Sequence, residues 1–217
     1  MTLPPRPLRP RFVVLDDTRT PADGVVVYEA KDPGRAVDEA IATGAPAPYG
    51  AVLWDSAVAL AQRLARQPCS GRRVLELGCG CGLVGLVCAR QGAQVLCTDV
   101  DPHTLRAVSM AAAELGVLIE TALFDFTDDG PLPLVHGEVA TDVVLADVLY
   151  EDHLARAAAR AAVRALDVGA RVYVGDPERA GRATLVRALR EAGVDVVFAG
   201  HVAVIEPGDR GARGHTP

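Results

Sequence analysis

Short apolar runs alternate with longer segments rich in alanine and leucine from Arg73 to the end of the chain. Continuous apolar runs are typical of strands buried on both faces, and apolar positions three and four residues apart are typical of helices. The pattern predicts strands at Val74–Leu77, Gln94–Thr98, Val117–Phe124, Asp142–Ala146, Arg171–Gly175, Val194–Ala199 and Val202–Glu206. It predicts helices at Leu83–Gln91, Pro102–Leu115, Asp152–Leu166 and Ala180–Ala192.

The connections between these elements set the expected topology. Strands separated by helices can run parallel, whereas only Gly200 and His201 separate the last two strands, which must therefore pair antiparallel. We predict an α/β fold with a seven-strand, mostly parallel sheet, a terminal antiparallel hairpin and helices on both faces.

The first 70 residues follow a different pattern. Two β-like runs, Phe12–Leu15 and Val25–Ala30, flank the turn-forming segment Pro21–Gly24, and helices are expected near Arg35–Thr43 and Ser56–Arg66. We predict disordered tails at 1–11, which holds four prolines, and at 207–217. This leaves an N-terminal extension at 12–70, which we expect also to form a lid over a bound cofactor, and one ligand-binding domain at 71–206.

Charge and composition exclude some function classes. The net charge of −6 is unfavourable for non-specific nucleic-acid binding, which needs a cationic face. No apolar run is long enough to span a bilayer, and the N-terminus lacks the apolar stretch of a secretory signal. Five cysteines without such a signal indicate reduced thiols in a cytoplasmic protein. Only one lysine, Lys31, is present, and the bias toward arginine resembles codon usage.

The segment Val74–Leu86, VLELGCGCGLVGL, carries the strongest chemical signal, because it runs from a strand through a glycine loop into a helix. Glycines at 78, 80 and 82 allow a tight turn and a close approach of a ligand to the main chain. The start of the next helix offers free N–H groups. Gly80, Gly82 and Gly85 match the dinucleotide fingerprint G-x-G-x-x-G, with Asp99 at the end of the next strand.

A second interpretation is favoured over the dinucleotide site. The pattern E-x-G-x-G-x-G from Glu76 to Gly82 resembles motif I of the Rossmann-like S-adenosylmethionine methyltransferases. An acidic residue before the glycines would repel a pyrophosphate but attract the ammonium of an aminopropyl group. The terminal hairpin resembles the extra strand of that fold, and the chain lacks a second domain for a dehydrogenase substrate.

Several of these residues also have structural alternatives. Asp99 fits the ribose hydroxyls of the ligand, because Asp101 is better placed to cap the helix that starts at Pro102. Cys79 and Cys81 have a poor spacing for zinc, so we expect no metal site.

Acidic residues recur where the predicted strands end, and the carboxyl ends of parallel strands form the usual ligand site. We therefore expect an acidic rim made of Glu76, Asp99, Asp125, Asp147 and Asp176. Asp125 and Phe126 are placed to reach an adenine, unless DFTDDG is only a solvated loop.

A longer resemblance covers residues 49–180. The stretches Tyr49–Leu64, with its Trp54-Asp55 pair, and Gly71–Pro102 resemble the seven-strand protein-lysine methyltransferases. Asp147-Val148-Leu149-Tyr150 is similar to the D-x-x-Y segment of that family. Val172–Ala180 resembles the branch that methylates the electron-transfer flavoprotein β subunit.

The resemblance implies a Rossmann-like fold, S-adenosyl-L-methionine as cofactor and a protein lysine as methyl acceptor. It also implies the cofactor-binding residues Trp54, Glu76, Gly78, Gly80, Gly82, Asp99, Asp125 and Phe126. Asp147 and Tyr150 would orient the acceptor amine, although they could instead cap the helix near Asp152. Trp54 could instead fill the core. A small-molecule N- or O-methyltransferase, and a cofactor-binding scaffold without catalysis, remain the alternatives.

Overall fold

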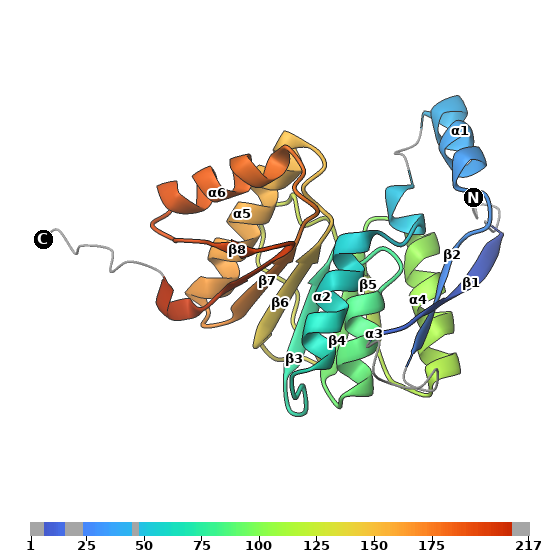
Figure 1. The fold of residues 1–217 in the computed structure, drawn as a ribbon, viewed down its shortest axis with the longest axis horizontal. Coiled ribbons are helices and arrows are strands. Elements are labelled where there is room, and N and C mark those ends of the chain that lie inside the picture. The colour runs from blue at the N-terminus through green and yellow to red at the C-terminus, as the bar shows by residue number, and fades with distance from the viewer. Residues whose placement is uncertain (1–6, 16–23, 45–47, 210–217) are drawn as a thin grey trace, which may run out of the picture.

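The computed structural model describes residues 7–15, 24–44 and 48–209 of the 217-residue chain. Its centre is a seven-stranded sheet of order β5-β4-β3-β6-β7-β9-β8, flanked by helices (Figure 1). Five neighbouring strands run parallel, and β9 pairs antiparallel with both β7 and β8. The strands are β3 (Arg73–Leu77), β4 (Gln94–Asp99), β5 (Glu120–Leu123), β6 (Asp142–Ala146), β7 (Arg171–Gly175), β8 (Phe198–Ala199) and β9 (Val202–Ile205). The predicted α/β fold with a terminal antiparallel hairpin is confirmed.

The core lies on both faces of this sheet, because successive strand residues point to opposite sides. Val144 packs into one hydrophobic cluster with the helices that precede β6, whereas Val143 and Leu145 pack into the other with the helices that follow it. All three side chains are fully buried. Burial on both faces explains why the strands are continuous apolar runs in the sequence.

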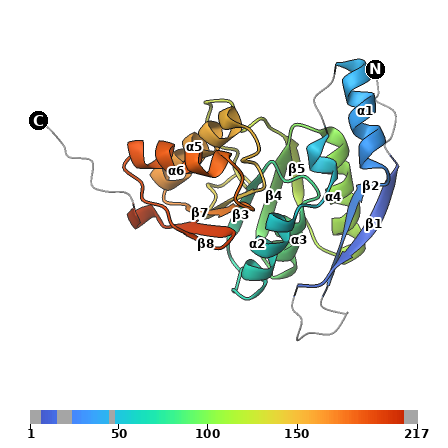
Figure 2. The ribbon, with the colours of Figure 1, turned by 45° about the horizontal axis from the view of Figure 1, so that its top comes forward.

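Two groups of helices cover the two faces (Figures 1 and 2). The first comprises α2 (Asp55–Ala65), α3 (Leu83–Arg90) and α4 (Pro102–Leu115), and the second comprises α5 (Asp152–Asp167) and α6 (Gly181–Glu191). These five of the six predicted helices lie within one residue of their expected bounds. In the described part of the chain no helix is long and apolar enough to span a membrane.

Two predicted strands are shorter than expected, and both differences have the same cause. Val117–Phe124 reduces to Glu120–Leu123, and Val194–Ala199 reduces to Phe198–Ala199. In each case a left-handed glycine, Gly116 or Gly193, ends the preceding helix. The N–H of the next valine then bonds to a carbonyl of the last helical turn, at 3.0 Å for Val117 and 2.9 Å for Val194. These valines complete helix caps and do not start strands.

An N-terminal β-hairpin includes residues 8–11, which were predicted to belong to a disordered tail. Strand β1 (Leu8–Val13) pairs antiparallel with β2 (Val25–Ala30), so the prediction of disorder is wrong for residues 8–11. The carboxylate of Glu29 binds Arg9 at 2.7 Å and Arg11 at 3.5 Å, which ties this proline-containing strand to β2. The predicted turn lies outside the described residues, apart from Gly24. At the other terminus, residues 207–209 form a 3-10 helix and not a tail.

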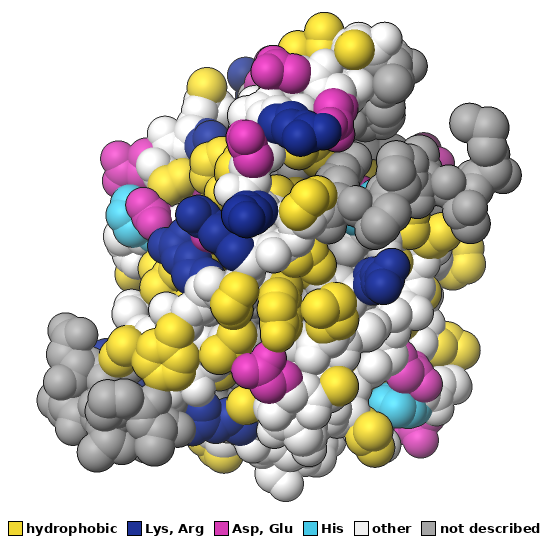
Figure 3. Space-filling view, turned by 90° about the vertical axis from the view of Figure 1, so that its right-hand side faces the viewer, with side chains coloured by type: hydrophobic (Ala, Val, Ile, Leu, Met, Phe, Trp, Pro, Cys, Tyr) yellow, Lys and Arg dark blue, Asp and Glu magenta, His cyan; other side chains and the backbone are white. Residues whose placement is uncertain are grey.

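The hairpin closes one end of the molecule, where β2 packs on α4 and α3. Basic side chains gather on the surface of this end, among scattered hydrophobic ones (Figure 3). Helix α1 (Pro33–Thr43) follows β2 and starts two residues earlier than predicted, because Asp32 accepts the Arg35 N–H at 3.0 Å and Pro33 occupies the first turn. The β8–β9 hairpin lies at the opposite end of the molecule (Figures 1 and 2).

Candidate active site

A cavity of about 550 Å³ lies where the parallel strands end. Its walls are the segments that follow β3, β4, β5 and β6, together with residues 48–57, which lead into α2. Such a volume lies within the range of about 300–1,000 Å³ that is typical of small-molecule sites. The position matches the rule that ligands bind where the strand order reverses, here on either side of β3. Nine of the ten predicted site residues line this one cavity: Trp54, Gly78, Gly80, Gly82, Asp99, Asp125, Phe126, Asp147 and Tyr150.

The glycine loop forms one side of the cavity. Gly78, Gly80 and Gly82 all have positive φ, of 62°, 50° and 68°. At Gly80 space is also limiting, because an added Cβ would lie 2.9 Å from the carbonyl oxygen of Gly50. The loop therefore needs glycine for its backbone conformation and, at Gly80, for its contact with the segment before α2.

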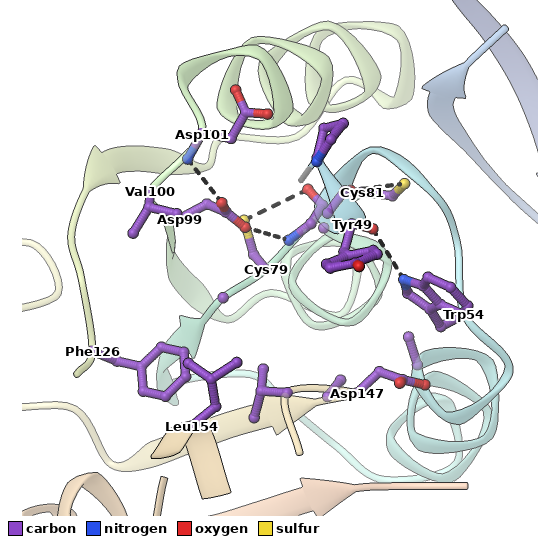
Figure 4. Close-up of a pocket in the computed structure, with 18 of the residues that line it drawn as sticks. Tyr49, Trp54, Cys79, Cys81, Asp99, Val100, Asp101, Phe126, Asp147 and Leu154 are labelled. Carbon is purple, nitrogen blue, oxygen red and sulfur yellow. Dashed lines mark hydrogen bonds between the residues drawn. The ribbon is translucent and has the colours of Figure 1, made fainter. Parts of the chain in front are cut away.

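Asp99, at the end of β4, fixes this loop and faces the cavity (Figure 4). Its carboxylate accepts the Gly80 N–H and the Asp101 N–H, each at 2.9 Å. Burial raises the pKa of Asp99, while these hydrogen bonds oppose the rise. As predicted, Asp101 and not Asp99 caps α4, by accepting the His103 N–H at 2.9 Å. Asp99 is thus a preset acceptor at the edge of the cavity.

Glu76 is the one predicted site residue that the structure places elsewhere. Its side chain is 1% exposed and accepts the Gly85 N–H at 2.8 Å and the Cys97 S–H at 3.4 Å. The carboxylate therefore lies under α3, where Gly85 leaves room for it: an added Cβ there would lie 2.7 Å from the Glu76 carboxylate. Asp176 is also not part of the expected acidic rim, because it is fully buried and its carboxylate binds Arg182 at 2.9 Å.

Phe126 and Val100 stand on the far wall of the cavity from Trp54 (Figure 4). Phe126 is buried and Val100 is 57% exposed. Asp125 is exposed, and its carboxylate accepts the N–H and the hydroxyl of Thr127 at 2.9 and 2.7 Å. Both predicted residues of this wall line the cavity, and the contact of Asp125 with an adenine stays a prediction.

Three aromatic side chains surround the opposite part of the cavity: Tyr49, Trp54 and Tyr150. The rings of Tyr49 and Tyr150 meet edge to face at 5.2 Å. The Trp54 indole N–H donates to the Tyr49 carbonyl at 3.0 Å, and its side chain is 37% exposed. Trp54 is therefore part of the cavity wall and not a core residue. Burial raises the pKa of the Tyr150 hydroxyl.

Asp147 follows β6 beside these aromatic residues, in the left-handed region at φ 59°. Its buried carboxylate accepts the hydroxyl of Ser56, and it accepts the Arg179 guanidinium with an Nε–Oδ1 distance of 2.6 Å. The N-cap of α5 is Glu151, without a side-chain hydrogen bond, so the alternative that Asp147 and Tyr150 serve as the helix cap is wrong. A strained, buried carboxylate at a cavity edge is typical of a functional site.

Sequence reasoning did not identify some contributors to this site. Ser56 and Arg179 hold Asp147, and Tyr49 and Val100 line the cavity. Tyr49 lies in the segment Tyr49–Leu64 and Arg179 in the segment Val172–Ala180, both of which resemble the family, so these two residues could have been proposed from the sequence. The contacts of Asp147 could not be predicted, because Ser56 and Arg179 lie 91 and 32 residues from it in sequence.

The electrostatics of the cavity favour a cationic ligand. Four aspartates line it: Asp99, Asp101, Asp125 and Asp147, of which Asp147 is already paired with Arg179. None of its described lining residues is a lysine or an arginine. Aromatic faces next to carboxylates add attraction for a positive charge. The cavity can thus hold a positively charged molecule beside preset hydrogen-bond acceptors.

Comparison with known proteins places this site in a family. The electron transfer flavoprotein beta subunit lysine methyltransferase of Danio rerio is 34% identical over 146 residues, which are 62% of this chain and 52% of that protein. The protein N-lysine methyltransferase METTL21A of Danio rerio is 48% identical over 54 residues, 24% of this chain and 25% of that protein. The chain spans about half the length of the flavoprotein-directed relatives that it matches.

Solved structures agree at the level of the fold. Magnesium protoporphyrin IX methyltransferase from Synechocystis PCC 6803, with bound SAH, superposes with a TM-score of 0.54 at 16% identity, over 70% of this chain and 81% of that one. The profile of the lysine methyltransferase family matches residues 40–179, a stretch that holds the glycine loop, Asp99, Asp147 and Tyr150 and ends at Arg179. The chain belongs to the lysine methyltransferase family.

Proposed function

We propose that the chain is a methyltransferase that moves the methyl group of S-adenosylmethionine to a lysine side chain of a protein. The observation that carries the proposal is that one cavity joins the glycine loop and Asp99 to Asp147 and Tyr150. A donor site and an acceptor site must share a cavity, because the methyl group passes directly from one to the other.

The residues present fit the proposed donor. The carboxylate of Asp99 is held by two backbone N–H groups and can accept the two hydroxyls of a ribose. The glycine loop lets the main chain touch the ligand, and Phe126 and Val100 offer apolar surface for an adenine. When bound, the donor supplies a methyl group already activated on a sulfonium.

The other half of the cavity fits an acceptor amine. Asp147 is buried and held on two sides, so its position is fixed before any ligand arrives. It can accept a hydrogen bond from the amine and orient the nitrogen lone pair. Tyr150 can close the pocket around the amine or accept a further hydrogen bond. Alignment of the nucleophile is the main task of the protein in such a displacement.

Incubation of the purified protein with radiolabelled S-adenosylmethionine and a desalted bacterial lysate tests the function. Label on a protein band, released as methyllysine after acid hydrolysis, is the expected result. Label confined to the small-molecule fraction would instead indicate a small-molecule N- or O-methyltransferase, and no label in either fraction would overturn the proposal.

Two variants separate the two halves of the site. We expect Asp99→Ala to abolish binding of S-adenosylmethionine in calorimetry, because charge-assisted hydrogen bonds contribute about 1.5–3 kcal/mol each. We expect Asp147→Ala to keep donor binding and lose transfer. Arg156→Gln is the matched control: this exposed arginine of α5 pairs with Asp152, away from the cavity, and should change neither.

A further inference from the structure

Arg179 contacts the proposed acceptor carboxylate from outside the cavity. Its guanidinium binds Asp147 Oδ1 through Nε, at 2.6 Å, and through a second nitrogen. The Arg179 side chain is 28% exposed, against 3% for Asp147. Arg179 does not line the cavity, whereas Asp147 does. A ligand can therefore reach Asp147 without displacing the arginine.

The position of Arg179 is built into the fold. The fully buried Asp176 accepts the N–H groups of Glu178 and Arg179 at 2.9 and 3.0 Å and is itself held by Arg182. Glu178 adopts a left-handed φ of 70° in this turn. The guanidinium also lies over the Trp54 ring, 5.2 Å from its centre. These contacts together fix the arginine beside Asp147.

Asp147 keeps some hydrogen-bonding capacity after these contacts are made. Oδ1 accepts two N–H groups of Arg179, and Oδ2 accepts the hydroxyl of Ser56. A carboxylate has about four acceptor positions, so one position on Oδ2 is left for an incoming amine.

A carboxylate without a partner would hinder the proposed reaction. A lysine amine has a pKa of about 10.4 and must lose its proton before it can attack a methyl group. An opposite charge within about 4–6 Å raises the pKa of such an amine by about 1–3 units and keeps it as an unreactive ammonium. The site therefore needs an acceptor of hydrogen bonds whose negative charge is already compensated.

We propose that Arg179 is a positioning residue that compensates the charge of Asp147, so that Asp147 orients the acceptor amine without holding it as an ammonium. The inference rests on the proposed function and adds how the site selects the neutral form of its substrate. Arg179 acts through Asp147 and touches neither the donor nor the acceptor.

Other charged and titratable groups face the cavity. They are the same in every variant, so their effect on the pH profile cancels when variants are compared. They come from every segment around the cavity: Tyr49 before α2, Cys79 and Cys81 after β3, Asp99 and Asp101 after β4, Asp125 after β5, and Tyr150 and His153 near the start of α5. Glu151 does not line the cavity but acts on Tyr150 through its charge. The Asp99 carboxylate accepts backbone N–H groups. Only the variants at Asp147 and Arg179 change the charge next to the amine.

The test is the pH profile of methyl transfer between pH 7 and about pH 11.5, with the full chain, saturating radiolabelled S-adenosylmethionine and the lysate protein band labelled by the wild type. For Arg179→Gln we expect the midpoint of the profile to move to higher pH by about one unit or more. This is a tenfold or greater loss well below the amine pKa of about 10.4 and a much smaller loss near pH 11.5. Arg179→Lys keeps the charge and should restore most of the profile. Donor binding, measured by calorimetry, should stay unchanged in both.

A double variant distinguishes compensation from simple support. In Asp147→Asn only the positive charge of Arg179 remains beside the amine, so the profile should move to lower pH, and adding Arg179→Gln should bring it back to the wild-type position. An equal loss at every pH in Arg179→Gln, or a double variant whose profile stays alkaline of the wild type, would overturn the proposal. If Arg179→Gln alone fails to fold, the shift between Asp147→Asn and the double variant gives the same test. Failure of the wild type to label any protein would instead count against the proposed function.

Discussion

Glu76 offers the sharpest test of the energetics of this fold, because it is a carboxylate buried beneath the glycine loop. It is 1% exposed on β3, and its Oε2 accepts the Gly85 N–H and the Cys97 S–H. Burial raises its pKa from an ordinary 4.5 to about 7, although the two hydrogen bonds oppose the rise. The nearby charge of Asp99 raises the pKa further. The perturbation is Glu76→Gln, which keeps the shape and removes the charge.

The direction in which stability changes with pH follows from proton binding by Glu76. The native state binds the Glu76 proton more tightly than the unfolded chain does, so the resulting stabilisation is complete below pH 4.5 and is lost as pH rises through 7. At about 1.4 kcal/mol for each unit of pKa, the interval from 4.5 to about 7 corresponds to roughly 3 kcal/mol of unfolding free energy. Glutamine at this position has no such dependence. Its altered hydrogen bonds add only an offset that is the same at every pH.

Urea denaturation from pH 5 to pH 8 measures the effect, followed by circular dichroism and by the fluorescence of Trp54, the only tryptophan. The stability of Glu76→Gln relative to the wild type should rise with pH by about 2–3 kcal/mol over this window. Glu191→Gln is the matched control, because Glu191 is exposed at the end of α6, and its difference from the wild type should be the same at each pH. A difference that is flat for Glu76→Gln would refute the reasoning that its burial costs free energy.

Two further predictions concern the cavity. Gly80→Ala should weaken binding of S-adenosylmethionine at least tenfold in calorimetry, because the new Cβ would meet Gly50. Gly116→Ala, which is equally left-handed but has open space around it, should cost about 1 kcal/mol of stability and leave binding intact; equal affinity in both variants would contradict the role of the Gly80 contact. Tyr150→Phe keeps the ring against Tyr49 and should slow transfer to the lysate protein while donor affinity stays unchanged; an unaltered rate would show that the hydroxyl takes no part.

The order and type of most elements could be predicted because they follow from local patterns. Apolar runs buried on both faces, glycines between strand and helix, and Asp101 before Pro102 each act within a few residues. The predicted strand beginnings at Val117 and Val194 were wrong because two interactions compete for these residues. Both valines favour a strand, but their N–H groups instead donate to carbonyls in the last turn of the preceding helix.

The fold class and the aspartates of the cavity could be predicted from the sequence, since parallel strands bring their carboxyl ends to one edge whatever their side chains are. The resemblance to a family added the other predicted cavity residues, such as Trp54 and Tyr150. What each carboxylate contacts depends on the tertiary structure. Glu76 and Asp99 both lie in the region predicted to bind the methyl donor. In the structure Glu76 is buried under α3, where it accepts the Gly85 N–H, whereas Asp99 lies at the cavity and accepts the Gly80 N–H. Asp147 gains Ser56 from α2 and Arg179 from the loop after β7. Such pairings join residues far apart in the chain, so only packing in three dimensions brings them within hydrogen-bonding distance.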